Sequence, residues 1–300
     1  MASETQTAVV AAIAANLLIA VSKTIVAALT GSAAMLSEAV HSFVDGGNDA
    51  LMLYGLHRSR APPDESHPLG YGHELYFWTL IVGMLIFGVG GGISIATGYL
   101  HIANNTLPEA SVWNYVVIGT AFVFEGWSWL YGLRAFRAEQ RGRGIVETIR
   151  ISKNPTTFSV LLEDSAALIG LVIAFFGIYL STKLQMPWLD GASSILIGAL
   201  LCFIALIMVY ESKGLLIGEG VEKRTLQGLR DIITADPSVE RVDRLLTMYM
   251  GPDDVLLAIE LRFRGNTDAI EIRAALARIK QVIRDCYPRI QHIFFDGISS

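Results

Sequence analysis

Long runs of apolar residues constrain this chain more than any other feature of its sequence. Six runs are long enough to cross the hydrocarbon core of a bilayer as a helix, which takes about 20 residues. They cover Ala8–Leu29, Ala33–Leu56, Leu75–Ile102, Val112–Phe136, Phe158–Ser181 and Pro187–Tyr210. Charged residues make up only 17% of the chain, whereas soluble domains carry about a quarter. We therefore expect an integral membrane protein in the lipid bilayer, with an all-α domain of six transmembrane helices.

Basic residues in the loops predict the orientation of these helices. Arg58 and Arg60 follow the second run, and residues 134–153 carry six arginines and lysines, whereas Lys183 is the one basic residue in the loops of the opposite side. The positive-inside rule then places both termini in the cytoplasm. The first run has no basic segment or clear cleavage site, and no Arg-rich transit segment precedes it, so we expect it to be retained. We expect the bacterial inner membrane as the location.

Composition changes after Tyr210, and the remainder reads as a soluble domain. The segment VLLAIELRFRG alternates apolar and polar residues, as a half-buried strand does. Amphipathic segments before and after it, and a final IQHIFFDG, give the order helix, strand, strand, helix, strand. We expect residues 1–213 to form the transmembrane transport domain and residues 214–300 a small α+β domain. The net charge of −5 favours no nucleic-acid partner, and two isolated cysteines predict neither a disulfide framework nor a cysteine zinc site.

The second apolar run contains a stripe of polar side chains. With about 100° between successive residues of a helix, they fall within roughly 100° of arc. The stripe consists of Glu38, His41, Asp45, Asn48 and Asp49. Ionisable groups in hydrocarbon cost several kcal/mol each unless paired or solvated, so they mark functional sites by default. A hydrogen-bond network between helices, with no substrate, is the structural alternative.

The fifth run carries the adjacent carboxylates Glu163 and Asp164, and the fourth carries Glu125. A lone Glu125 beside Trp127 is also explained as an acceptor for the indole. Imidazole nitrogen and carboxylate oxygen together suit Zn²⁺, while Mn²⁺, Fe²⁺ and Co²⁺ stay open. These ligands must lose protons before they bind metal, which is a physical basis for metal/proton exchange. Adjacent residues on a helix point about 100° apart, and which of Glu163 and Asp164 is the direct ligand stays open.

Three segments resemble the cation diffusion facilitator family: SEAVHSFVDGGNDALMLYGL, HRSRAPPDESHPLGYGHE and LLEDSAALIG. The chain looks most similar to the branch that includes an animal mitochondrial zinc transporter. The resemblance implies a homodimeric exchanger that moves Zn²⁺ or a related ion against protons. It implies His41, Asp45 and Asp164 as metal ligands. Val160 stands where the family usually has a histidine, so Glu163 or a water would replace that ligand.

The resemblance also implies a ferredoxin-like fold and a dimerisation role for residues 214–300. We expect no regulatory metal there, because His292 is its one histidine and Asp296 lies about 13 Å further along a strand. In the loop after the second run, Tyr71 stands where some members have a metal-binding histidine. We interpret this Pro- and Gly-rich loop as a rigid turn capped by His67.

Three functions compete at this stage. A secondary transporter of divalent transition metal fits the resemblance and the polar stripe. A membrane metal sensor or scaffold, which binds metal without moving it, fits the altered ligand set of the fifth run. An intramembrane metal hydrolase would need an activated nucleophile or an HExxH site, and the chain has neither. We therefore expect no enzyme, and the glycine run GVGGGIS indicates close helix packing rather than a nucleotide loop.

Overall fold

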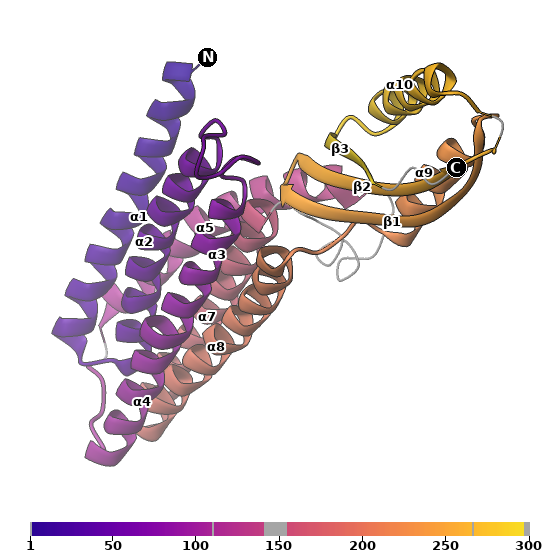
Figure 1. The fold of residues 1–300 in the computed structure, drawn as a ribbon. Coiled ribbons are helices and arrows are strands. Elements are labelled where there is room, and N and C mark those ends of the chain that lie inside the picture. The colour runs from indigo at the N-terminus through magenta and orange to yellow at the C-terminus, as the bar shows by residue number, and fades with distance from the viewer. Residues whose placement is uncertain (1, 110, 141–154, 266, 297–300) are drawn as a thin grey trace. The chain divides into compact units, whose positions relative to one another are not determined.

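The computed structural model describes residues 2–109, 111–140, 155–265 and 267–296 (Figure 1). The chain divides into two compact units. Residues 1–56 and 77–212 form the first unit, and residues 57–76 and 213–300 form the second. Most of the basic loop used above to predict orientation, residues 141–154, lies outside the described residues.

The first unit is built from helices that run alongside one another (Figure 1). They are α1 (Ala2–Thr30), α2 (Ala33–Ser59), α3 (His73–Leu85), the π-helical turn η1 (Ile86–Gly91), α4 (Gly92–Asn104), α5 (Val112–Gln140), α7 (Pro155–Leu184) and α8 (Trp188–Ile217). Within the described residues, four helices are long and apolar enough to cross a membrane: His73–Asn104, Val112–Arg134, Phe158–Leu184 and Trp188–Ile217. These four confirm four of the expected spans. The helix α2, which carries the polar stripe, is not apolar enough to be among these four.

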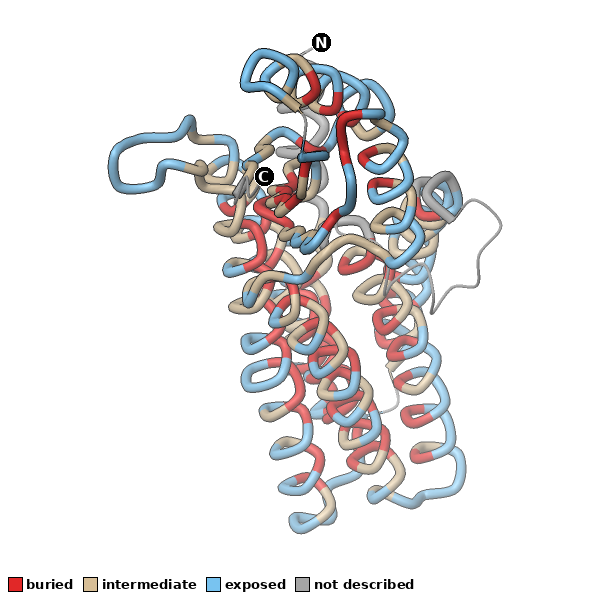
Figure 2. Tube along the Cα trace, turned by 45° about the vertical axis from the view of Figure 1, so that its right-hand side comes forward, coloured by how far each residue is buried: buried red, intermediate tan, exposed pale blue. Residues whose placement is uncertain are grey.

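Buried residues lie on the inward sides of these helices, and exposed residues, many of them apolar, lie on the outward sides (Figure 2). The inner core joins α1, α2, α5, α7 and α8 through aliphatic side chains such as Met35, Leu171 and Leu201. An exposed apolar surface of this extent is what a lipid-facing bundle presents.

Glycines bring the third span and α8 into backbone contact. A Cβ on Gly98 would lie 2.4 Å from the carbonyl oxygen of Gly191, and one on Gly198 would lie 2.7 Å from the carbonyl oxygen of Gly91. Small residues at such crossings let two membrane helices approach closely. The structure thus confirms the expected close packing of the GVGGGIS run, and it places a π-helical turn at the same segment.

Asp190, in the first turn of α8, caps the N-terminus of α2 from another helix. Its carboxylate accepts hydrogen bonds from the Ala33 amide at 2.6 Å and from the Ser32 hydroxyl at 2.7 Å. The same carboxylate lies 3.3 Å from Nε2 of His101 on α4. Because a negative charge at a helix N-terminus is stabilising, this buried cluster fixes the start of α2 against α4 and α8.

The second unit contains α9 (Lys223–Thr234), β1 (Val239–Gly251), β2 (Asp254–Phe263), α10 (Ala269–Cys286) and β3 (Ile290–Asp296). This is the order expected from the sequence. The sheet has the order β1-β2-β3, with β1 and β2 antiparallel and β2 and β3 parallel. The alternation of β2 is confirmed, because every second residue from Val255 to Phe263 is buried. Those side chains share one core with Leu229 of α9 and Ile279 of α10.

The loop between α2 and α3 packs within the second unit. Nε2 of His73 lies 3.0 Å from the carbonyl oxygen of Tyr249 at the end of β1. Gly72 lies so close to the backbone of Met250 that a Cβ there would overlap the Met250 carbonyl group. This loop therefore belongs with the β1–β2 hairpin, which its position in the sequence does not indicate.

The side chain that caps the turn within this loop is Asp64, not His67 as expected. The carboxylate of Asp64 accepts from the amides of Ser66 and His67 at 2.9 and 2.7 Å and from the Tyr71 hydroxyl at 2.6 Å. The Tyr71 hydroxyl and the His67 amide hold the pKa of Asp64 below its usual range. Asp64 takes the capping role because a short carboxylate reaches the amides two and three residues ahead, as in an Asx turn.

Candidate functional site

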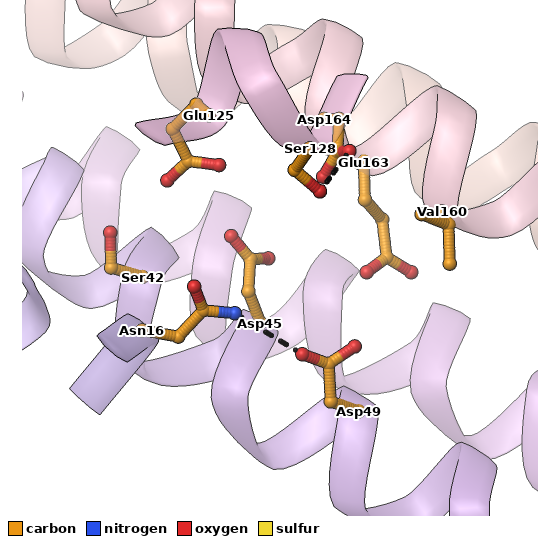
Figure 3. A pocket seen from close by; sticks show the side chains of 9 residues that line it. All are labelled: Asn16, Ser42, Asp45, Asp49, Glu125, Ser128, Val160, Glu163 and Asp164. Atoms are coloured by element: carbon orange, nitrogen blue, oxygen red, sulfur yellow. Dashed lines mark hydrogen bonds between the residues drawn. The ribbon is translucent and has the colours of Figure 1, made fainter. Parts of the chain in front are cut away.

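A polar cavity of about 60 Å³ lies inside the helical unit (Figure 3). We call it the carboxylate cavity. It is lined by Asn16 of α1, by Ser42, Asp45 and Asp49 of α2, by Glu125 and Ser128 of α5, and by Val160, Glu163 and Asp164 of α7. Since a water occupies about 10–15 Å³ by this kind of measure, the cavity has room for a few waters or for one partly hydrated ion.

The helix α2 supplies one wall of the cavity. Asp45 and Asp49 are one helical turn apart, and Figure 3 shows both carboxylates turned toward the side chains of α5 and α7. Asn16 of α1 fixes Asp49, because its amide donates to Oδ2 at 3.2 Å. The i, i+4 spacing of the polar stripe thus places these carboxylates in one cavity.

His41 is on the same helix but does not line the cavity. Its ring is 2% exposed, and Nδ1 lies 3.3 Å from Oδ1 of Asp45. Neither ring nitrogen has a hydrogen-bond partner among the described residues. A buried imidazole whose nitrogens make no hydrogen bond costs free energy, which an incoming partner would recover.

The helix α7 supplies the opposite wall. Glu163 and Asp164 both line the cavity, although they are adjacent in the sequence (Figure 3). Oδ2 of Asp164 accepts from the Ser128 hydroxyl at 2.8 Å, which ties α7 to α5. Val160 also lines the cavity, so the position of the usual family histidine faces the site with an apolar side chain.

Glu125 was the weaker candidate in the sequence, and the structure places it in the cavity. The indole beside it, Trp127, is 78% exposed and points away from the core. The indole that does donate a hydrogen bond in this region is that of Trp129, to Ser165 at 2.9 Å. Glu125 therefore adds a fifth carboxylate to those of α2 and α7.

Sequence reasoning missed the neutral lining residues Asn16, Ser42 and Ser128. It also missed Lys23, which is 0% exposed on α1 and 3.0 Å from Oε2 of Glu38. Lys23 also donates to the Ser42 hydroxyl at 2.8 Å. A charged residue in the middle of an apolar run was the signal that could have found Lys23.

The predicted metal ligands do not converge on one point. Within the described part of the chain, no three His, Cys, Asp or Glu side chains converge closely enough to hold one ion. This holds for the carboxylate cavity, for the loop of His67 and His73, and for the second unit, where His292 pairs with Asp254 at 3.3 Å. Of the predicted ligands, Asp45, Glu163 and Asp164 share the cavity and His41 lies behind Asp45.

Comparison with known proteins identifies relatives over most of the chain. The cation efflux transmembrane domain matches residues 9–217. The mitochondrial proton-coupled zinc antiporter SLC30A9 is 31% identical over 261 residues in Xenopus laevis and over 238 in Homo sapiens. Those matches cover 84% and 79% of this chain but 47% and 42% of the relatives, so the chain spans about half their length. Magnetosome protein MamB of Magnetospirillum gryphiswaldense is 22% identical over 94% of this chain and 90% of that protein.

These relatives confirm the resemblance and correct the location. The expected bacterial inner membrane is wrong, because the frog and human relatives at 31% identity are mitochondrial proteins. The error has a physical reason. Loop charges report the side of a membrane on which a loop lies, and they carry no information about which membrane it is.

Proposed function

The chain belongs to the cation efflux family of membrane metal transporters, and on that premise we propose that it carries Zn²⁺ across a membrane in exchange for protons, as a homodimer. The observation that supports this most is the carboxylate cavity, which five carboxylates from three helices line together. Intramembrane carboxylates at this density bind cations or protons and are otherwise very costly.

We assign Asp45, Asp164 and Glu163 as the oxygen ligands of the transported ion and His41 as its nitrogen ligand. The three carboxylates line the cavity, and His41 lies one turn before Asp45 with neither ring nitrogen in a hydrogen bond among the described residues. Entry of the ion would draw the ring of His41 past Asp45 and complete a mixed N/O set, which suits Zn²⁺. The wall at Val160 leaves one ligand fewer than the usual family pattern, and Glu163 is positioned to replace it.

Exchange follows from the chemistry of these groups. Carboxylate and imidazole bind metal only when deprotonated, so each ion that enters displaces protons, and protons arriving from the other side displace the ion. Alternating access requires the α2 wall and the α7 wall to move relative to each other. The hydrogen bonds of Ser128 with Asp164 and of Asn16 with Asp49 keep each wall attached to a neighbouring helix.

The architecture is part of the same proposal. We propose six transmembrane spans, with α1 and α2 added to the four strongly apolar ones, a transport domain at residues 1–213 and a ferredoxin-like domain at residues 214–300 that carries the dimer contact. The face of the sheet that α9 and α10 leave uncovered supports that contact. It presents Leu246 and Phe294, 48% and 51% exposed, in register with Ala258 between them.

The test is flux in proteoliposomes loaded with a zinc-sensitive dye under an imposed pH gradient. Wild type should take up Zn²⁺ in step with the gradient, and Asp45→Ala and Asp164→Ala should each lose at least about tenfold in rate, because each removes a charged ligand. Asp253→Ala is the matched control, since this carboxylate is 82% exposed and outside the cavity. Full flux in Asp45→Ala would remove Asp45 from the site.

The same assay separates the ion and the competing function. If folded wild type shows no Zn²⁺ flux, Mn²⁺, Fe²⁺ and Co²⁺ are tested as the transported ion under the same gradient. Calorimetric binding of metal with no flux of any of these ions would support a membrane metal sensor or scaffold instead.

A further inference from the structure

The ion pair of Lys23 and Glu38 lies next to the carboxylate cavity, and the transport proposed above does not use it. Both side chains are 0% exposed, and Nζ of Lys23 lies 3.0 Å from Oε2 of Glu38. Lys23 is the only buried lysine or arginine in the described part of the chain. Replacing a buried ion pair by apolar groups is often neutral or stabilising, so stability alone does not explain why this pair is present.

The pair has a direction relative to the cavity. The Lys23 ammonium also donates to Oγ of Ser42 at 2.8 Å, and Ser42 lines the cavity. Lys23 is close enough to act electrostatically on both Asp45 and Glu125. The positive end of the pair therefore lies directly behind the cavity wall, in contact with Ser42.

The negative end packs against Gly170 of α7. A Cβ on Gly170 would lie 2.4 Å from Oε1 of Glu38, so the carboxylate in this position packs directly on the glycine. Neither Glu38 nor Lys23 lines the cavity itself, but the ammonium contacts Ser42, which does. The pair thus forms a dipole whose ammonium end contacts Ser42 of the cavity lining and whose carboxylate end packs against Gly170.

We propose that Lys23, oriented by Glu38, sets the affinity of the cavity for the transported cation and keeps that affinity low enough for release. Five carboxylates around one dication would bind it tightly, and transport requires binding that is weak enough for the ion to leave. A resident cation directly behind the wall opposes the entering charge and offsets part of this attraction. This inference rests on the proposed transport of a divalent cation.

The experiment compares wild type with three variants of the pair, measured for both flux and binding. The double variant Lys23→Met/Glu38→Gln removes the dipole and keeps similar volume. The double variant Lys23→Glu/Glu38→Lys reverses the dipole, and Lys23→Arg keeps the charge. We expect KM for Zn²⁺ to fall about tenfold in the neutral pair. The repulsion of the ion by Lys23 is partly cancelled by its attraction to Glu38, and at an effective dielectric constant of about 20 the remainder corresponds to a change of this size. KM should fall further in the reversed pair and stay near wild type in Lys23→Arg.

The maximal rate should move with affinity, which a purely structural pair would not produce. In the neutral and reversed variants, tighter binding should come with slower maximal flux, because release becomes limiting. An unchanged KM in a folded neutral pair, or a KM that rises in the reversed pair, would overturn the proposal. If neither double variant folds, as judged by size-exclusion profile and thermal unfolding, the pair serves stability and the proposal fails.

Calorimetric titration of Zn²⁺ into the purified variants keeps this inference separate from the transport proposal. If wild type shows no Zn²⁺ flux but the variants bind Zn²⁺ in the expected order of affinity, the proposed exchange is wrong and the role of Lys23 is supported. If wild type shows normal Zn²⁺ flux and all variants bind Zn²⁺ with equal affinity, the exchange is supported and the role of Lys23 is wrong.

Discussion

Substituting Gly98 by alanine tests the backbone contact between α4 and α8. The added Cβ would lie 2.4 Å from the Gly191 carbonyl oxygen and 2.9 Å from the Ile195 amide nitrogen. Ordinary contact begins near 3.4 Å, so the two helices must separate locally by about 1 Å. Overpacking typically costs about 1–3 kcal/mol, and the upper end applies because backbone atoms cannot change rotamer.

The gain in helix propensity from glycine to alanine, about 1 kcal/mol, offsets part of this cost. We therefore expect Gly98→Ala to lower stability by about 2 kcal/mol, or roughly 4–8 °C in Tm for a chain of this size. Gly119→Ala on α5 is the matched control. A Cβ there meets open space, so only the propensity term acts and Tm should stay level or rise.

The assay is thermal unfolding of the detergent-solubilised full chain, followed by tryptophan fluorescence and checked by size exclusion. A Tm for Gly98→Ala that equals or exceeds that of Gly119→Ala would show that α4 and α8 do not meet through glycine backbone. A fall in Tm of both variants by the same amount would point to a general effect of alanine in these helices.

Two further predictions concern other polar contacts of the structure. Asp190→Ala should lower the stability of the full chain by about 3 kcal/mol, because it leaves the first amide of α2 buried without an acceptor. Asp190→Asn should lose less stability, because its amide oxygen can still accept that hydrogen bond. Thermal unfolding measures both variants. In the second unit, burial opposes ionisation of Asp236, but Arg278 and the Ser238 amide outweigh it and hold its pKa below the usual range, and hydrogen bonds from Arg278 and Ser238 lower the pKa of Glu271. Depressed carboxylate pKa values stabilise the fold above about pH 4 and lose that effect as pH falls through the lower folded values, so acid unfolding should separate wild type from Arg278→Met above pH 4 and bring them together in stronger acid.

The carboxylates of the site could be predicted from the sequence because ionisable residues stand out in apolar runs. That signal predicts Asp45 and Asp164. The glycine run likewise predicts close helix packing, although it does not predict the π-helical turn. Asn16 and Ser42 were not, because small neutral side chains are common in membrane helices and their role depends on which faces of α1 and α2 meet. That choice of faces is tertiary, and no local pattern encodes it.

Lys23 was missed for a different reason. A single lysine in a run of 22 residues, Ala8–Leu29, barely changes its hydropathy, and a long flexible side chain usually reaches an interface. Its burial depends on a partner 15 residues later, on the next helix. The exclusion of His41 from the cavity could not be predicted from helical spacing either. His41 and Asp45 share one face of α2, and only the tertiary structure shows that Asp45 lies between His41 and the cavity.

The packing of residues 57–76 against the β1–β2 hairpin makes the second unit discontinuous in the chain. Exchange of residues 213–300 between relatives would therefore not transfer a complete part, because the recipient would keep its own loop with a foreign hairpin. The backbone contact at Gly72 tolerates no side chain, so such a chimera should express well only when the loop and the C-terminal residues come from the same parent. For inheritance and for protein engineering alike, these two segments form one exchangeable part even though 136 residues separate them.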